Sequence, residues 1–133
     1  MSLFVDTSVW SLAMRHDGKD DVDEVQALVA ALTDGRVVTT GLVLQELLQG
    51  FHGPRARGRI VERFAAVPLV TPDRLDHIAA ADLRNDCRRR GIAVTTVDAL
   101  IAQLCIRHDL TLLTTDRDFA RIAKHRALVL WRP

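Results

Sequence analysis

The stretch "LLTTDRDF" (residues 112–119) combines an apolar run with acidic residues that follow it directly. The run "LTLLTT" (110–115) has the apolar and β-branched composition of a strand that is covered on both faces. "DRDFARIAKH" (116–125) then has the spacing of a short helix. Asp116 and Asp118 therefore stand where a strand ends and a helix begins, and we expect their carboxylates to lie at that edge of a sheet.

The same alternation of strand and helix patterns covers the rest of the chain. It predicts one α/β domain over residues 1–133, a three-layer α/β/α sandwich with a mostly parallel sheet of four to five strands. The pattern predicts a polar connection at 52–59 and places an edge strand at 67–70, because Pro68 cannot donate to a central ladder. Besides 110–115 and 67–70, strands are predicted at 3–6, 36–40 and 127–131. Besides the closing helix, helices are predicted at 7–15, 20–35, 41–51, around 60–64, 73–90 and 95–109.

Four acidic residues are predicted to meet at one edge of this sheet. Right-handed crossovers place the carboxyl ends of parallel strands together, and ligands bind there in such sheets. Asp6 ends the first strand and Asp116 follows the fourth, while Glu46 and Asp98 lie on helices that begin near the same edge. Two carboxylates about 4 Å apart repel by about 4 kcal/mol at an effective dielectric of 20. Such a cluster requires either raised pKa values or a bound cation.

Each acid also has a purely local explanation. Asp6 is a favoured N-cap residue for the helix that starts after it. Thr95 with Asp98, and Thr115 with Asp118, match the spacing of a capping box. Capping alone, however, does not require that acids from distant segments gather at one edge.

The residue types around these acids indicate a hard cation. Oxygen ligands suit Mg²⁺ or Mn²⁺ better than zinc, and no His or Cys stands close in sequence to the four acids. A carboxylate-held cation of this kind suits phosphodiester hydrolysis. The chain has no "GxxxxGK[ST]" phosphate loop and no Ser/His/Asp arrangement, so NTP hydrolysis and covalent catalysis are poorly supported.

Four segments together resemble the PIN-domain nucleases. They are "VDTS" (5–8), the lone Glu46, "VDALIA" (97–102) and "LLTTDRDF". The order of these segments and the size of the chain look most like the VapC-type toxins of bacterial toxin–antitoxin pairs. The resemblance covers essentially the whole chain and implies a Mg²⁺- or Mn²⁺-dependent endoribonuclease.

The resemblance also implies a role for each matching residue. Asp6, Glu46, Asp98 and Asp116 match the acidic quartet of the family. Asp6, Asp98 and Asp116 correspond to metal ligands, and Glu46 to a group that positions or deprotonates the attacking water. The residues that match supporting positions beside them are Thr7, Ser8, Thr114 and Asp118.

The net charge of +1 does not by itself indicate a nucleic-acid partner, although sixteen of the eighteen basic residues are arginine. RNA approaching an acidic site needs cations nearby, and the candidates are Arg55, Arg57, Arg59 and Arg117. The run "CRRRG" (87–91) is more typical of a solvated helix end, where cations favour the helix dipole, than of RNA contact.

The resemblance implies two protein partners, a second copy of the chain and a cognate antitoxin. The sequence shows neither a signal peptide nor an apolar run of about 18 residues, so we expect a cytoplasmic protein without a membrane association. Two other functions stay open: a non-catalytic PIN-like module that binds RNA or a partner, and a phosphatase or receiver domain. "DTSVW" lacks the second Asp expected two residues on for the latter.

Overall fold

The computed structural model describes residues 1–16 and 21–133. Helices separate all the strands of the described residues: two lie between the first and second strands, four between the second and third, and one between the third and fourth. The strands are β1 (Leu3–Val5), β2 (Val37–Val38), β3 (Thr111–Leu113) and β4 (Val129–Leu130). The helices are α1 (Thr7–Arg15), α2 (Asp23–Thr33), α3 (Gly41–Gly50), α4 (Pro54–Phe64), α5 (Arg74–Arg89), α6 (Thr96–Arg107) and α7 (Asp118–Ala123).

The sheet of the described residues has four strands in the order β2-β1-β3-β4, and every pairing is parallel. Leu3 lies opposite Val37 on one side of β1, and Phe4 lies opposite Leu112 on the other. The chain first adds β2 to one side of β1 and later adds β3 to its other side. The topological switch point therefore lies between the carboxyl ends of β1 and β3, where such sheets bind ligands.

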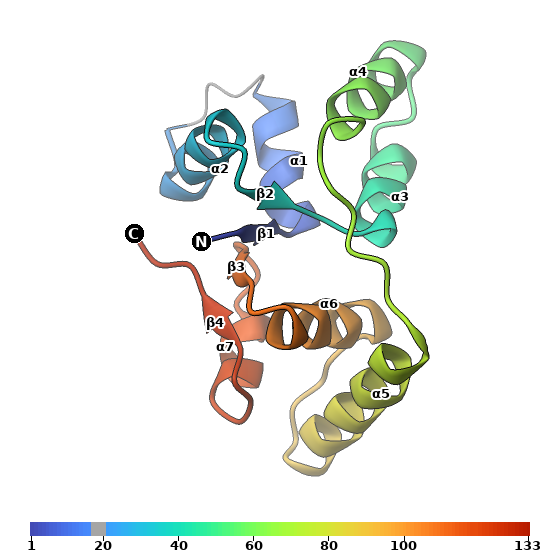
Figure 1. Ribbon diagram of the computed structural model, residues 1–133, viewed down its shortest axis with the longest axis vertical. Helices are drawn as coiled ribbons and strands as arrows, with labels where there is room; N and C mark the ends of the chain where they lie inside the picture. The colour runs from blue at the N-terminus through green and yellow to red at the C-terminus, as the bar shows by residue number, and fades with distance from the viewer. Residues whose placement is uncertain (17–20) are drawn as a thin grey trace.

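Helices cover the sheet on two sides, which confirms the predicted α/β/α layers. Figure 1 shows α1 to α4 in the upper half of the view and α5 to α7 in the lower half, with the sheet between them. Within the first group, α1 packs on α2 and α3, and α3 packs on α4; within the second, α6 packs on α5 and α7.

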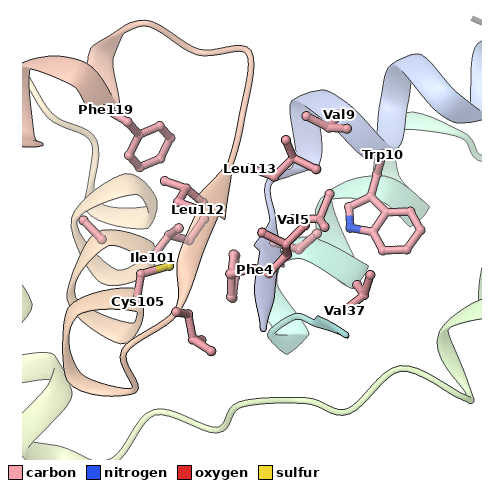
Figure 2. Close-up of a cluster of buried hydrophobic side chains, with 14 of the residues drawn as sticks. Phe4, Val5, Val9, Trp10, Val37, Ile101, Cys105, Leu112, Leu113 and Phe119 are labelled. Atoms are coloured by element: carbon pink, nitrogen blue, oxygen red, sulfur yellow. The ribbon is translucent and has the colours of Figure 1, made fainter. Parts of the chain in front are cut away.

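The core joins both helix groups to the central strands. Phe4 and Leu112 point toward Ile101 of α6, whereas Val5 points toward Trp10 of α1 (Figure 2). All five side chains are buried. Successive strand residues thus serve opposite faces of the sheet, as the period of two requires. Each such aliphatic or aromatic side chain contributes about 1.5–3 kcal/mol when buried.

Two local predictions are wrong. The predicted connection at 52–59 is largely helical, because α4 begins at Pro54, which tolerates the first helical position. The predicted strand at 67–70 makes only a single parallel bridge, between Thr39 and Leu69. The sheet of the described residues therefore has four strands, the lower number of the predicted four to five.

The helix predicted at 20–35 is found as α2, from Asp23 to Thr33. Gly35 follows it with a φ of 67°, a left-handed conformation that favours glycine and ends the helix. Asp20, where the prediction begins, lies outside the described residues. Among the helices that the structure describes, none is sufficiently long and apolar to span a membrane.

Candidate functional site

Asp6 and Asp116 lie at the carboxyl ends of the two central strands. Asp6 follows β1 directly, and its backbone N–H donates to the carbonyl oxygen of Leu113 at 2.9 Å. Its side chain is almost completely buried, with 7% of the residue exposed. A carboxylate in such a place must be satisfied by hydrogen bonds or by a cation.

Two hydroxyl groups satisfy one oxygen of Asp6. Ser8 Oγ and Thr114 Oγ1 donate to Asp6 Oδ2 at 2.9 and 2.8 Å. Each hydroxyl in turn accepts a backbone N–H, Ser8 from Thr115 at 3.1 Å and Thr114 from Asp116 at 3.0 Å. The amides after β3 thus orient both hydroxyls so that their hydrogens point at Asp6.

This arrangement corrects the capping explanation for Asp6. Asp6 is the N-cap residue of α1 by position, but its side chain accepts no helix N–H. Both hydroxyls use Oδ2, which leaves Oδ1 for another ligand. One hydroxyl from α1 and one that follows β3 therefore hold the carboxylate, and no backbone N–H of the helix does.

Glu46 is connected to the same helix start. The hydroxyl of Thr7 donates to Glu46 Oε1 at 2.9 Å, which links α1 to α3. Glu46 is exposed, so this bond lies at the surface. The adjacent residues Thr7 and Ser8 thus serve two different acids, Glu46 and Asp6.

The charges of the other three acids affect the pKa of Asp98. Asp98 is half-buried in the first turn of α6, and its backbone N–H donates to the hydroxyl of Thr95 at 3.1 Å. Burial raises its pKa, hydrogen bonding with Thr95 lowers it, and the charges of the remaining three acids, Asp6, Asp116 and Glu46, raise it again, to about 6. The other three predicted acids therefore each lie within electrostatic reach of Asp98. Of the predicted capping box, only the Thr95 half is formed.

The second predicted capping box, Thr115 with Asp118, is wrong. The N–H of Asp118 donates to Asp116 Oδ1 at 2.9 Å, so Asp116 makes the bond expected of Thr115. The side chain of Arg117, the N-cap residue of α7, makes no capping bond. The carboxylate of Asp118 is exposed beside this turn.

The acids fit a divalent cation in chemistry but are not gathered around one point. Within residues 1–16 and 21–133, no three His, Cys, Asp or Glu side chains are grouped so that they could hold a metal ion. All four donors are nevertheless carboxylates, the ligands of hard cations. A cation would also relieve the repulsion that raises the pKa of Asp98.

The arginines predicted to contact RNA lie on helix ends and surfaces. Arg55, Arg57 and Arg59 are exposed on α4, and Arg59 lines a cleft between α1 and α4 together with Met14. Arg117 is exposed beside Asp116. The structure does not bring the three arginines of α4 into the hydrogen-bond network around Asp6, so their role stays a prediction.

One buried acid was not predicted from the sequence. Asp76 is 1% exposed in the first turn of α5, where it forms a reciprocal capping box with Asp73. Arg107 Nη1 donates to Asp76 Oδ2 at 2.6 Å and ties the end of α6 to the start of α5. Burial alone would raise the pKa of Asp76, but the backbone bond from Asp73 and the Arg107 guanidinium hold it below 3.8. The spacing of Asp73 and Asp76 is the signal that would have identified this box.

This chain is similar to known proteins in both sequence and structure. The family model described as PIN domain matches residues 3–125. Two curated relatives are the VapC ribonuclease Mb1587 of Mycobacterium bovis and the ribonuclease VapC11 of Mycobacterium tuberculosis. Each is 30% identical over 124 residues, which cover 92% of this chain and 92% of the relative.

Several solved structures share the fold. FitAcB from Neisseria gonorrhoeae has a TM-score of 0.76 at 20% identity, covering 98% of this chain and 97% of that one. DNA-bound VapBC from Salmonella typhimurium has a TM-score of 0.75 at 21% identity, with the same coverage. VapBC-5 from Mycobacterium tuberculosis has a TM-score of 0.70 at 24% identity and full coverage of both chains. Because the family model spans nearly the whole fold and the curated relatives are similar across the same length, this chain belongs to the PIN domain family.

Proposed function

We propose that this protein is a Mg²⁺- or Mn²⁺-dependent endoribonuclease that hydrolyses RNA phosphodiester bonds and acts as the toxin of a toxin–antitoxin pair. The observation that carries the proposal is the buried carboxylate of Asp6 at the end of β1, which Ser8 and Thr114 hold through Oδ2 so that Oδ1 stays open to a ligand. Family membership supports it, since the curated relatives at 30% identity are named VapC ribonucleases.

In this proposal Asp6, Asp98 and Asp116 hold the cation. A bound divalent cation supplies a water of lowered pKa and positive charge against the phosphate. Asp6 contributes a pre-oriented oxygen, since Ser8 and Thr114 fix its carboxylate through Oδ2. Orientation before binding lowers the cost of assembling the site.

Glu46 and Asp118 complete the proposed site. Glu46 positions the attacking water or accepts its proton, and the hydroxyl of Thr7 holds the Glu46 carboxylate toward the start of α1. Asp118 supports the turn that carries Asp116, since its N–H is bonded to the Asp116 carboxylate. The water oxygen bonds to phosphorus as the bond between phosphorus and the sugar oxygen breaks. Glu46 accepts the proton of the water, and the departing sugar oxygen takes a proton from solvent water.

The proposed partners are RNA as substrate, a second copy of the chain and a cognate antitoxin, in the cytoplasm. The antitoxin is supported by structural neighbours that are VapBC proteins, one of them a member of the VapBC family of toxin-antitoxin systems. A size-exclusion and co-purification experiment with the protein encoded next to this one tests both protein partners.

One observation favours an alternative, a PIN-like module that binds RNA or a partner without cleaving it. The acids of the described residues are not grouped closely enough to hold an ion as they stand. The alternative predicts that RNA is retained and stays intact at every metal concentration.

Incubation of the purified protein with single-stranded RNA separates these functions. Cleavage with Mn²⁺ or Mg²⁺ should be abolished by EDTA and by Asp6→Asn. Asp82→Asn, the same substitution at an exposed position of α5, is the matched control and should cleave as the wild type does. RNA cleavage that survives both EDTA and Asp6→Asn would contradict the proposal.

A further inference from the structure

A basic cleft lies beside the acidic site. Its volume is about 470 Å³, and it lies between α5 and residues 91–95. Arg84 and Arg88, four residues apart, line it from the same face of α5. Thr95 and Asp118 line it from the side of α6 and α7.

The guanidinium group of Arg84 is held in place but not neutralised. Its Nε donates to the carbonyl oxygen of Val94 at 2.8 Å, which leaves the four N–H groups on Nη1 and Nη2 for a ligand. Among the described residues, neither Arg84 nor Arg88 forms an ion pair with a carboxylate. Two planar cations without acidic partners, one of them anchored, suit bidentate binding of phosphate.

The neighbouring arginines of the same helix behave differently. Arg89 and Arg90 each pair with Asp86, at 3.9 and 3.3 Å. They fit the solvated helix end that "CRRRG" indicates, whereas Arg88 faces the cleft. The run therefore divides into two cations that share the carboxylate of Asp86 and one, Arg88, that has no acidic partner in the part of the chain that the structure describes.

The cleft lies next to the ends of the elements that carry Asp98 and Asp116. Thr95, on its wall, accepts the backbone N–H of Asp98 at 3.1 Å. Asp118, on the same wall, donates its backbone N–H to Asp116 at 2.9 Å. A chain bound among the acids can thus continue into the cleft.

We propose that Arg84 and Arg88 form a phosphate subsite that holds the RNA backbone next to the bond to be cleaved. The inference rests on the proposed function. An acidic site repels the RNA backbone, so the substrate needs a cationic contact close to the point of cleavage, and the two arginines supply it. The contact is made to phosphate and carries no base specificity.

Anisotropy of a fluorescein-labelled single-stranded RNA of mixed sequence, measured in EDTA over a range of salt concentrations, tests the subsite. Arg84→Gln with Arg88→Gln should weaken binding about 10-fold and reduce the salt slope by about 1–2. Arg89→Gln, which removes the same charge one residue outside the cleft, is the matched control. Arg88→Lys should recover part of the affinity, because it restores the charge without the planar fork.

Arg88→Gln alone tests the subsite if Arg84→Gln disturbs the 91–95 segment. Residue 88 is bonded to that segment only through its backbone carbonyl oxygen, which accepts from Gly91, and the substitution leaves this bond in place. Arg88→Gln with the affinity and salt slope of Arg89→Gln would overturn the inference. If the wild type then still cleaves RNA with Mn²⁺, the proposed function stands while the subsite falls. A loss of affinity specific to Arg84 and Arg88, in a protein that cleaves no RNA, would support the subsite and contradict the proposed hydrolysis.

Discussion

Asp76 and Asp98 occupy the same position in two helices that pack on each other. Each is the third residue of its helix, and each donates its backbone N–H to the side chain of the N-cap residue, Asp73 in α5 and Thr95 in α6. Their pKa values nevertheless move in opposite directions. That of Asp76 is below 3.8, and that of Asp98 is raised to about 6.

The difference comes from partners that are distant in sequence. Asp76 is fully buried, but it receives a backbone N–H from Asp73 and the guanidinium of Arg107. Asp98 is less buried and faces three other acids instead. One helix start thus stabilises the fold, while the other carries a destabilising charge that suits a cation-binding site.

The largest expected effect is on catalysis, and it separates the two aspartates most sharply. Asp98→Asn should lower the rate of RNA cleavage by on the order of 1000-fold, about 4 kcal/mol, because it removes a proposed metal ligand. Asp76→Asn should leave the rate per folded molecule unchanged. Initial rates with Mn²⁺, normalised to the folded fraction from circular dichroism, test this. Equal losses in the two variants would break the comparison.

The next largest effect is on stability. Here substitution of Asp76 is expected to be harmful, whereas substitution of Asp98 is not. Asp76→Ala should lower the free energy of unfolding by about 2 kcal/mol, because it removes a helix cap and a hydrogen bond to a charged group. In metal-free protein at pH 7, Asp98→Asn should raise it by about 1 kcal/mol, allowing for the partial exposure of the site. Urea unfolding in EDTA measures both, with Asp82→Asn as the control. A stabilising Asp76→Ala would contradict the interpretation.

The pH dependence of these two changes sharpens the comparison further. The lowered pKa of Asp76 contributes stability that is present above pH 3.8 and is lost as the pH falls through the lower, folded-state value. The destabilisation by Asp76→Ala should therefore shrink only below about pH 3.8. The raised pKa of Asp98 favours the protonated folded state, so its ionisation costs stability above about pH 6.

The gain from Asp98→Asn should accordingly fade as the pH is lowered from 7 through 6 to 3.8. Unfolding free energies of wild type and both variants at several pH values, without metal, measure the two windows. A gain from Asp98→Asn that grows as the pH falls would have the wrong sign.

The smallest expected effect concerns a hydroxyl that acts through Asp6. Thr114→Val removes the 2.8 Å bond to Asp6 Oδ2 and should lower the cleavage rate roughly 10-fold, about 1.4 kcal/mol. Thr33→Val, which removes a hydroxyl bonded to the carbonyl of Val29 in α2, is the matched control. Equal rates for the two variants would show that the orientation of Asp6 does not limit cleavage.

The fold was predictable where strand and helix patterns are strong. The apolar strands around Phe4 and Leu112 are recognisable in the sequence because a parallel sheet buries both of their faces. The start of α4 was not predictable, because its arginines and Gly58 look like a connection. Packing against the core explains why this segment is helical. The ring centroids of Phe64 and Trp10 are 4.6 Å apart, and Ile60 is buried.

The sequence indicated which acids form the candidate site but not which hydrogen bonds they make. Strand ends indicate where Asp6 and Asp116 lie, whereas the choice of partner depends on the pairing of β1 with β3. That pairing brings Thr114 to Asp6 across 108 positions of sequence and leaves Thr115 without its expected capping role. The position of the Arg84 guanidinium group depends in the same way on a tertiary contact, the hydrogen bond from its Nε to the carbonyl oxygen of Val94.

The parallel pairing of β1 with β3 has a consequence for the order in which the protein is made. Asp6 leaves the ribosome early, but Thr114 and Asp116 emerge only after most of the chain has been synthesised. A nascent chain halted before Thr111 would carry Asp6, Glu46 and Asp98 without the strand that brings the last acid to them. The topology therefore delays assembly of the acidic site until translation is nearly complete.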